Sequence, residues 1–420
     1  MEISYNLKYQ KSTFANKVIL DKEGEIIIYT KGFRLKGKGG NDRGELINFS
    51  EIKEFYYRDE KIFFITFNKE KYVLSDAGTL FDQLVQDIYK SRNEFLLDAL
   101  FMRGGKLKGE YEGHFDRISK FGRPINKGHA KFRLYEDTLV VIPTQQDAFA
   151  LHFNFFNFHE FDDMEYNLKI VMEDGVTVLM SQLGNDFEFF QEKMDGTLGG
   201  MYQNVVNNVL REVFPQFNAA TLLKLAYKMK AGKAVSKYDI KKMDKEMAVE
   251  VEKFIYQDPV LVEKVSILTE MCDEENIFFG VAQDTAVKGG FIRWLMFVVP
   301  EDNALGFSIL PRWQEGKDAK NTDDHMMFFY KIIMEKGNPA DKLEDKVLEV
   351  NQALVNLSFA KDPTYKDKRE LKHSPYLYAI RKLPYLRILR KSYVGKANGT
   401  DVTAWQAQVQ DLLAKCKMVG

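Results

Sequence analysis

Residues 32–39, with the sequence GFRLKGKG, nearly match a phosphate-binding loop. Such a loop needs spaced glycines, a lysine that reaches the phosphates, and a Ser or Thr that binds Mg²⁺. It must also lead into a helix whose first N–H groups hold phosphate. Here Gly39 stands where the hydroxyl is needed, and the following residues, GNDRGELINF, indicate another strand. We therefore interpret the match as accidental and expect no nucleotide site.

The same segment is basic. Its cations are Lys31, Arg34, Lys36, Lys38 and Arg43, and Asp42 is the one acid among them. Clustered cations in a loop suit an anionic ligand. A glycine-rich turn kept polar for solubility has the same composition, and a run of charge is more often solvated surface than a site. We favour the solvated turn and keep anion binding as the alternative.

A second basic segment spans residues 361–396, where eleven Lys and Arg face three acids, a local net charge of +8. Tyrosines are interleaved with these cations, and that combination suits nucleic acid or an anionic membrane. The candidate contacts are Arg381, Lys382, Arg387, Arg390 and Lys391. Apolar residues also recur at near-helical spacing over residues 376–391, so we favour a packed helix, bent at Pro384, whose cations extend from buried stems.

No pattern in the chain indicates a metal site, a cofactor site or a catalytic centre. His152 and His159 lie seven residues apart, so on one strand they would point to opposite faces. Asp323, Asp324 and His325 form a trio that distant residues would have to complete. Serine nucleophile motifs, HExxH and paired CxxC motifs are absent. We expect no catalytic, cofactor-binding or metal-binding residue.

Length and composition narrow the class of protein. A chain of 420 residues predicts two to four domains, and 45% hydrophobic with 29% charged residues predicts a folded protein. The net charge of -1 gives no overall attraction to polyanions. Two distant cysteines, no signal-like start and no long apolar run predict a cytoplasmic protein without a transmembrane segment.

Two stretches of the first half resemble one another. Residues 18–30 (VILDKEGEIIIYT) align with residues 132–144 (FRLYEDTLVVIPT), which pairs Leu20 with Leu134 and Ile27 with Val141. Each stretch is interpreted as a strand, a tight turn and a second strand. Further on, residues 47–55 align with the segment that starts at Leu151. Both copies then continue into a hairpin, with two-residue turns expected at residues 68–69 and 174–175.

The last part of each copy changes from strand to helix periodicity. Ser75, Gly78, Phe81 and Leu84 of the first copy match Ser181, Gly184, Phe187 and Phe190 of the second. Apolar residues recur there at helical spacing, and the helices are expected to end near Met102 and Phe214. The chain thus predicts two α+β units of short antiparallel strands, each closed by a C-terminal helix.

This pattern resembles the tandem PH-like, or GRAM-like, repeats of uncharacterised bacterial proteins. It is more remotely similar to the tandem PH-like domains of structure-specific recognition proteins, which are histone chaperones. The resemblance implies two PH-like barrels and transfers no functional residue. Inositol phosphate-binding barrels of this kind use a basic loop between early strands, which makes residues 31–43 a candidate. Residues 362–365 (DPTY) could be the Pro-Ile-Tyr-like element that bacterial members carry before a C-terminal helix.

The second half is predicted to be a helical connector followed by an α+β domain. We divide the chain into PH-like repeats at 1–103 and 104–216, a helical connector at 217–260 and a C-terminal α+β domain at 261–420. Ser236 is a plausible N-cap in the connector. Residues 277–333 indicate strands, the last of which could also be a buried helix. A third diverged barrel is one form that this domain could take.

The leading functional hypothesis is a non-enzymatic binding or scaffolding protein. Its barrels would engage a protein partner or a second copy of the chain. The alternative is a peripheral binder of anionic membrane or nucleic acid that works through residues 31–43 and 361–396. An enzyme whose site is scattered over several domains is a further alternative.

Overall fold

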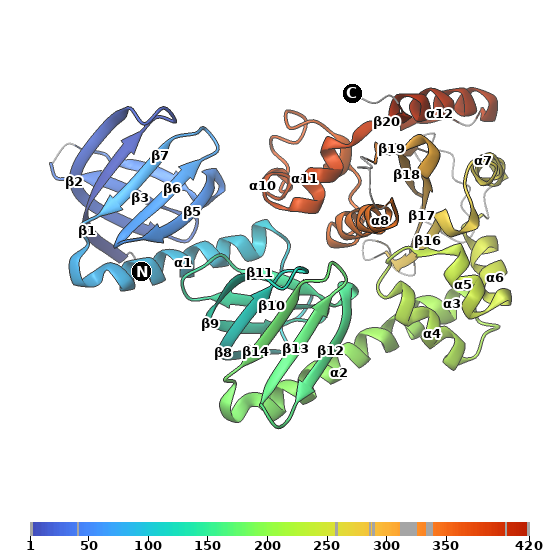
Figure 1. The fold of residues 1–420 in the computed structure, drawn as a ribbon, viewed down its shortest axis with the longest axis horizontal. Helices are drawn as coiled ribbons and strands as arrows, with labels where there is room; N and C mark the ends of the chain where they lie inside the picture. The colour runs from blue at the N-terminus through green and yellow to red at the C-terminus, as the bar shows by residue number, and fades with distance from the viewer. Residues whose placement is uncertain are drawn as a thin grey trace. The chain divides into compact units, whose positions relative to one another are not determined.

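The computed structural model of this chain describes residues 3–39, 42–256, 259–284, 287, 290–310, 326–332, 339–399 and 401–417. The chain forms two compact units, Met1–Met194 and Asp195–Gly420. Figure 1 colours the first unit from blue to green and the second from green to red. The fold is mixed α+β, with two curled seven-stranded antiparallel sheets in the first unit and a third sheet in the second. Of the helices in the described residues, none is long and apolar enough to cross a bilayer.

The first repeat is a seven-stranded antiparallel sheet in the order β4-β3-β2-β1-β7-β6-β5, followed by helix α1. Its elements are β1 (Ile3–Ser12), β2 (Val18–Tyr29), β3 (Gly32–Gly37), β4 (Glu45–Asn48), β5 (Ile52–Arg58), β6 (Lys61–Thr66), β7 (Lys71–Ser75) and α1 (Phe81–Ala99). Alternate strand residues point inward, as the burial of Tyr5, Leu7 and Tyr9 along β1 shows. These side chains share one core with the first half of α1.

The second repeat has the same strand order, β11-β10-β9-β8-β14-β13-β12, and is followed by helix α2. Its elements are β8 (Gly109–Ile118), β9 (Pro124–Leu134), β10 (Thr138–Pro143), β11 (Phe149–His152), β12 (Phe156–Asp162), β13 (Asn167–Met172), β14 (Thr177–Ser181) and α2 (Phe187–Val205). Two chain segments with one topology confirm the internal repeat. The prediction of two α+β units, each closed by a C-terminal helix, is therefore correct at this level.

The later part of the predicted alignment is also correct. Phe81 and Phe187 are the first residues of α1 and α2, and both are buried. Each helix follows a short turn that begins at Gly78 or Gly184, with φ of 59° and 58°. A left-handed φ at the same place in both copies explains why glycine stands there twice.

The earlier part of the alignment was wrong by several residues. Residues 18–29 form the single strand β2, whereas residues 132–144 span the end of β9, a turn and β10. The pairing of Ile28 with Phe33 matches the pairing of Leu134 with Leu139. Leu134 therefore corresponds to Ile28 and not to Leu20. By the same register Val141 corresponds to Leu35 and not to Ile27.

The hairpins between β6 and β7 and between β13 and β14 also differ from the prediction. Each has a three-residue loop, closed by hydrogen bonds from Thr66 N to Glu70 O and from Met172 N to Val176 O. The third loop residue is left-handed in both, Lys69 with φ 67° and Gly175 with φ 82°. A three-residue loop with a left-handed third position is the next most common hairpin connection after the expected two-residue turn.

The second unit is built on a six-stranded antiparallel sheet in the order β15-β16-β17-β18-β19-β20. Its strands are β15 (Val235–Ser236), β16 (Ile277–Gln283), β17 (Phe291–Val299), β18 (Ala304–Ile309), β19 (Met327–Lys331) and β20 (Tyr393–Ala397). The last apolar run of residues 277–333, for which the sequence allowed either a strand or a buried helix, is strand β19. Neighbours in this sheet are consecutive along the chain, so its topology differs from that of the two repeats and does not make a third copy of them.

Helices of the second unit cover this sheet. They are α3 (Arg211–Val213), α4 (Ala219–Met229), α5 (Lys237–Met243), α6 (Lys245–Ile255), α7 (Pro259–Thr269), α8 (Pro339–Asn356), α9 (Asp362–Tyr365), α10 (Leu377–Lys382), α11 (Pro384–Lys391) and α12 (Val402–Lys417). The predicted N-cap is correct, because the Ser236 hydroxyl accepts a hydrogen bond from Asp239 N. Residues of α4, α5, α6 and α12 share one hydrophobic core with the sheet.

Candidate binding surfaces

Helix α1 belongs to both repeats of the first unit. Its first half, with Leu84 and Ile88, lies in the core of the first repeat. Near its other end, Leu97 packs in a second cluster with Tyr135 and Val140 of the second repeat. One helix therefore packs in the core of the first repeat and against a hydrophobic cluster of the second.

Two buried polar side chains of α1 hold the loop between β10 and β11. Arg92 has a fully buried side chain and makes a bidentate ion pair with Asp147, with N–O distances of 2.6 and 2.7 Å. The Asn93 amide donates to Pro143 O and Gln146 O and accepts from Ala148 N. The guanidinium of Arg92 also lies 5.5 Å from the ring centre of Phe55 in the first repeat. This contact set, the α1 joint, ties both repeats to the helix.

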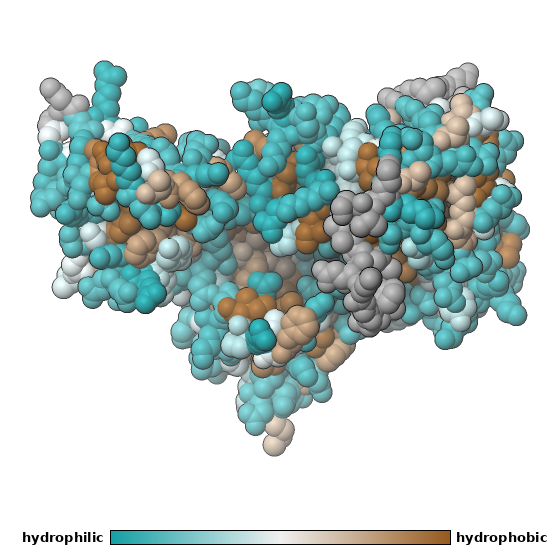
Figure 2. Space-filling model, turned by 45° about the horizontal axis from the view of Figure 1, so that its top comes forward, coloured by the Kyte–Doolittle hydropathy of each residue, from teal (hydrophilic) through white to brown (hydrophobic). Residues whose placement is uncertain are grey.

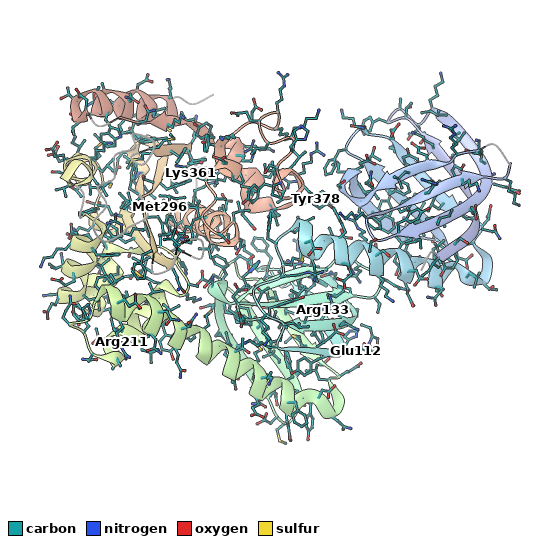
Figure 3. All side chains as sticks on the ribbon, turned by 180° about the vertical axis from the view of Figure 1, so that it is seen from behind. Glu112, Arg133, Arg211, Met296, Lys361 and Tyr378 are labelled. Carbon is teal, nitrogen blue, oxygen red and sulfur yellow. The ribbon has the colours of Figure 1, made fainter. Side chains whose placement is uncertain are left out.

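A cleft of about 440 Å³ runs beside this joint, between α1 and the outer face of β8, β9 and β10. We call it the α1 cleft. Its walls are the polar face of the helix and the outward side chains of the sheet. The lining residues are Gln83, Gln86, Asp87, Lys90, Asn93, Glu94, Glu112, His129, Ala130, Lys131, Arg133, Ile142, Pro143 and Thr144. In Figure 3, Glu112 and Arg133 are seen on strands of the second sheet.

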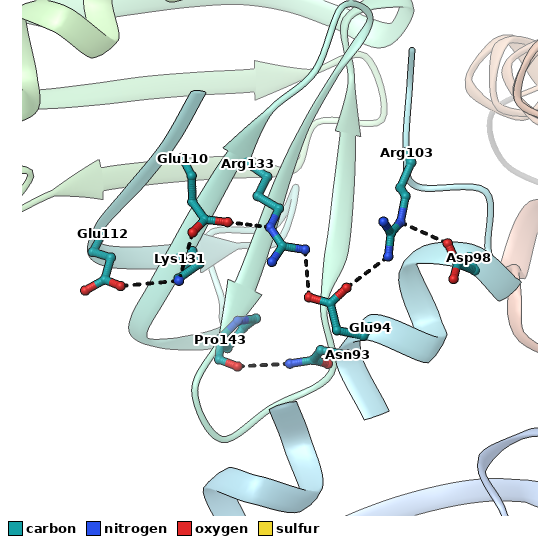
Figure 4. Close-up of polar contacts among 9 residues, drawn as sticks. All are labelled: Asn93, Glu94, Asp98, Arg103, Glu110, Glu112, Lys131, Arg133 and Pro143. Atoms are coloured by element: carbon teal, nitrogen blue, oxygen red, sulfur yellow. Dashed lines mark hydrogen bonds and ion pairs between the residues drawn. The ribbon is translucent and has the colours of Figure 1, made fainter. Parts of the chain in front are cut away.

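A chain of ion pairs borders the α1 cleft (Figure 4). Arg133 bridges Glu94 of α1 at 2.7 Å and Glu110 of β8 at 2.6 Å. Arg103 pairs with the same Glu94 at 2.9 Å, and Lys131 pairs with Glu110 at 2.9 Å. The network therefore links the helix to two strands and fixes the cleft's polar rim.

The pKa shifts in this network follow from its geometry. Burial disfavours the charged form of Arg133, but hydrogen bonds and charge from Glu110 and Glu94 outweigh it, so the pKa of Arg133 is raised. Burial alone would raise the pKa of Glu110, yet Arg133 and Lys131 lower it. Both groups stay charged over the physiological range. Apart from His129, the lining carries three acids, Asp87, Glu94 and Glu112, and three bases, Lys90, Lys131 and Arg133.

The basic residues of segment 31–43 do not form one cluster. Lys31 lies in the turn before β3, whereas Lys38 and Arg43 follow its other end, roughly 20 Å away at about 3.3 Å per strand residue. Arg34 and Lys36 lie within β3. Acids of β2 pair with two of the lysines, Glu25 with Lys36 at 3.5 Å and Glu23 with Lys38 at 2.9 Å. The first regular element after Gly39 is strand β4. A phosphate-binding loop would instead lead into a helix.

Within the second basic segment, residues 376–391 fold as two short helices and not as one bent helix. Helix α10 ends at Lys382, Leu383 is extended, and Pro384 begins α11. Arg381 and Lys382 end α10, and Arg387 and Lys391 are exposed on α11. Arg390 is half-buried and donates hydrogen bonds to Pro363 O at 2.7 Å and Lys366 O at 2.5 Å. Burial lowers the pKa of Arg390, although the charge of Asp367 opposes this shift.

The contacts of Arg390 give a testable contrast. Replacing Arg390 with Glu should lower the free energy of unfolding by about 2 kcal/mol or more, because two hydrogen bonds from a charged donor are lost. The same change at exposed Arg387 should cost less than about 0.5 kcal/mol. Urea unfolding of both variants measures the difference. Equal losses at the two positions would show that Arg390 does not anchor helix α9 (DPTY, residues 362–365).

The two histidines considered for metal binding, His152 and His159, lie in different elements of the second repeat. His152 ends β11 and His159 lies in β12, so the two are on different strands and not on one strand as expected. Burial lowers the pKa of His152, against the opposing charge of Asp137. In the described part of the chain, no group of three or more His, Cys, Asp or Glu residues could hold a metal ion. Asp323, Asp324 and His325 lie outside the described residues.

Comparison with known proteins adds little to this geometry. No family model matches the chain, and no curated protein matches it. Among solved structures, one of Vav1 inhibited by an allosteric inhibitor matches with a TM-score of 0.20 and 12% identity. The match covers 31% of this chain and 47% of that chain. A likeness this weak carries no argument about fold or function.

Sequence reasoning missed the α1 joint and the α1 cleft. A signal for the joint was present, because Arg92 continues the apolar series of Leu84, Val85 and Ile88 at helical spacing. A charged residue in that register has to find a partner when it is buried. Its partner Asp147 lies far along the chain, and no spacing rule in the sequence identifies it. The cleft depends on the same long-range contact.

Proposed function

We propose that this chain is a non-enzymatic binding or scaffolding protein whose two repeats are PH-like barrels that together engage a protein partner. The observation that carries the proposal is the α1 joint, which holds two copies of one strand-rich unit on a shared helix through Arg92, Asn93 and Asp147. A fixed pair of binding modules presents a larger and more specific surface than two modules on a flexible linker.

The α1 cleft is the part of this surface that we assign to the partner. It is concave, it lies beside the joint, and its ionisable lining is balanced in sign. Small apolar groups, Ala130, Ile142 and Pro143, lie among the charges. A peptide segment with both apolar and charged side chains would bury its apolar groups there while its charges meet partners in the rim.

The strand arrangement supports the PH-like part of the proposal. Seven antiparallel strands followed by one C-terminal helix are what the resemblance implies, and both repeats have this arrangement. The surface in Figure 2 supports a partner of limited contact area, since the visible face is mostly hydrophilic and its apolar side chains form separate small patches. Large continuous apolar patches mark obligate interfaces, whereas small ones suit transient partners.

The proposal is tested by filling the α1 cleft. Gln86→Trp adds bulk at an exposed position in its wall, and Gln203→Trp makes the same change at an exposed position of α2 outside it. The immobilised parent chain and its Gln203→Trp variant should each retain the same partner from native lysate in a stoichiometric amount. Gln86→Trp should bind that partner at least about tenfold more weakly, a loss of about 1.4 kcal/mol in binding free energy.

Two other results would redirect the assignment. Equal partner retention by Gln86→Trp and Gln203→Trp would show that the cleft is not the contact. Salt-sensitive retention on DNA or anionic vesicles, with no protein partner, would favour the polyanion-binding alternative. A concentration-dependent dimer in sedimentation, lost in Gln86→Trp, would identify the partner as a second copy of the chain.

A further inference from the structure

His114 of β8 and His129 of β9 lie directly opposite one another on the outer face of the second sheet. Their Cα atoms are partners in the register of the two strands, and the following residues, Phe115 and Ala130, are buried. The His129 carbonyl accepts a hydrogen bond from Thr144 N, so the backbone polar groups of His129 face away from β8. The two histidines are therefore a non-hydrogen-bonded pair, the kind whose side chains lie closest. We call this pair the histidine rung.

The two imidazole rings are close enough to share a metal ion. Their centres lie 5.8 Å apart, with the ring planes at 87°. A metal ion about 2.0–2.1 Å from an imidazole nitrogen lies roughly 3.2 Å from the centre of that ring, so two rings on one ion have centres at most roughly 6.4 Å apart. Tetrahedral coordination places the centres roughly 5.2 Å apart. A small side-chain rotation would therefore bring one nitrogen of each ring to the same ion.

Pairs of opposite charge flank the histidine rung on the same face. On one side Lys131 is opposite Glu112, with its Nζ 3.6 Å from a carboxylate oxygen. On the other side Lys127 is opposite Asp116. The Asp116 carboxylate also lies 3.8 Å from His114 Nε2. The four flanking charges cancel in pairs, so no excess of positive charge repels a cation from the rung.

The first repeat has a different pair at the same place. Lys8 of β1 is the counterpart of His114, because Lys8 pairs with Ser75 as His114 pairs with Ser181. The partner of Lys8 in β2 is Glu23. The first repeat thus opposes a cation to an acid, whereas the second opposes two side chains that ligate metal ions when neutral. A metal site at this position would belong to the second repeat alone.

We propose that the histidine rung binds a late first-row divalent metal ion of the class of Zn²⁺ and Cu²⁺, through one nitrogen of each ring. Imidazole suits these ions, whereas Mg²⁺ and Ca²⁺ prefer oxygen ligands. Among the described residues no group of three or more His, Cys, Asp or Glu could hold a metal ion, so water completes the coordination. Paired strands hold both ligands in place before the ion arrives.

The site goes beyond the proposed partner-binding role. Of the two histidines, His129 also lines the α1 cleft. Metal binding is measured on the chain alone, so its outcome is independent of whether the cleft engages a partner.

The decisive variants remove one imidazole at a time. His114→Gln and His129→Gln each keep a polar side chain, and His373→Gln removes an exposed histidine of the second unit as the matched control. The untagged full-length chain is titrated calorimetrically with Zn²⁺, and with Mg²⁺ for comparison. Because only the neutral imidazole binds a metal ion, the titrations are made at about pH 7.5 and about pH 5. Electron paramagnetic resonance with Cu²⁺ counts the bound nitrogens.

The first repeat offers a gain-of-function control. The double variant Lys8→His with Glu23→His places the same opposed pair on β1 and β2. The Glu23 carbonyl accepts a hydrogen bond from Lys38 N, so this pair has the same backbone geometry as the histidine rung. The double variant should bind one more Zn²⁺ per chain than the parent, with an affinity within about tenfold of the parent site, because the two ligands are equally placed.

The parent chain and His373→Gln should bind Zn²⁺ at the histidine rung and show two nitrogens bound to Cu²⁺. Zn²⁺ affinity should fall at least about tenfold in His114→Gln and in His129→Gln, because the second ligand then no longer adds to the first. Binding should be lost at the lower pH, and Mg²⁺ should not bind. No Zn²⁺ binding by the parent, or binding that is unchanged in either rung variant, would overturn the proposal.

Discussion

Replacing Phe187 with Ala should lower the free energy of unfolding of the first unit by about 3 to 5 kcal/mol, since the truncation leaves a cavity that the surrounding rings fill only partly. Phe187 is the first residue of α2 and is 3% exposed. Its ring centre lies 5.9 Å from that of Phe161 and 5.5 Å from that of Tyr166. The ring therefore joins the start of the closing helix to the β12–β13 hairpin.

Phe189 provides a matched control on the same helix. It is 69% exposed, so Phe189→Ala should cost less than about 0.5 kcal/mol. The three tryptophans, Trp294, Trp313 and Trp405, all belong to the second unit by position, so their fluorescence does not report on this change. Urea unfolding followed by circular dichroism, together with hydrogen exchange of residues 104–194, measures the effect of this change. Equal losses in the two variants would show that α2 does not close the core of the second repeat.

The part of the repeat that could be predicted from sequence is the part with three independent signals. Around Gly78 and Gly184 a left-handed turn residue, a following Phe and a change to helical periodicity occur together. Each signal restricts the register by itself, and a shift of even one residue would break all three. The predicted pairs Phe81 with Phe187 and Leu84 with Phe190 were therefore correct.

The early strands could not be aligned in the same way, because β2 carries a charged run on an exposed stretch. Asp21, Lys22 and Glu23 are exposed, yet they continue the strand by pairing with β1. Charged residues between apolar ones favour a turn when only one strand is considered. In the structure β1 supplies the hydrogen-bond partners of that stretch, so the strand runs through it. Strand pairing is a long-range contact, and local sequence does not encode its register.

The same limit applies to the candidate sites. The basic segments were visible as runs of charge, but whether a cation is free depends on acids that lie far along the chain. Glu23 and Glu25 pair with lysines of segment 31–43 from a neighbouring strand.

The α1 joint is expected to depend on Asp147. Replacing Asp147 with Ala leaves Arg92 buried without its counterion, and it should cost about 2 to 3 kcal/mol in the free energy of unfolding. The Asp147 side chain is 40% exposed, which places the expected cost below that of a fully enclosed pair. Water can reach part of the site and solvate the stranded charge. Urea unfolding by circular dichroism measures the loss, and hydrogen exchange of residues 93–103 should locate it at the joint.

Asp98→Ala is the matched control, because Asp98 also pairs with an arginine, Arg103, but is 72% exposed. Its loss should cost less than about 0.5 kcal/mol. The double variant Arg92→Met with Asp147→Ala should recover much of the stability lost in Asp147→Ala, since no charge is then left buried. If the double variant is no more stable than Asp147→Ala, the penalty comes from the lost contacts of the β10–β11 loop. In that case Asn93, with its three backbone hydrogen bonds, is the main support of the joint.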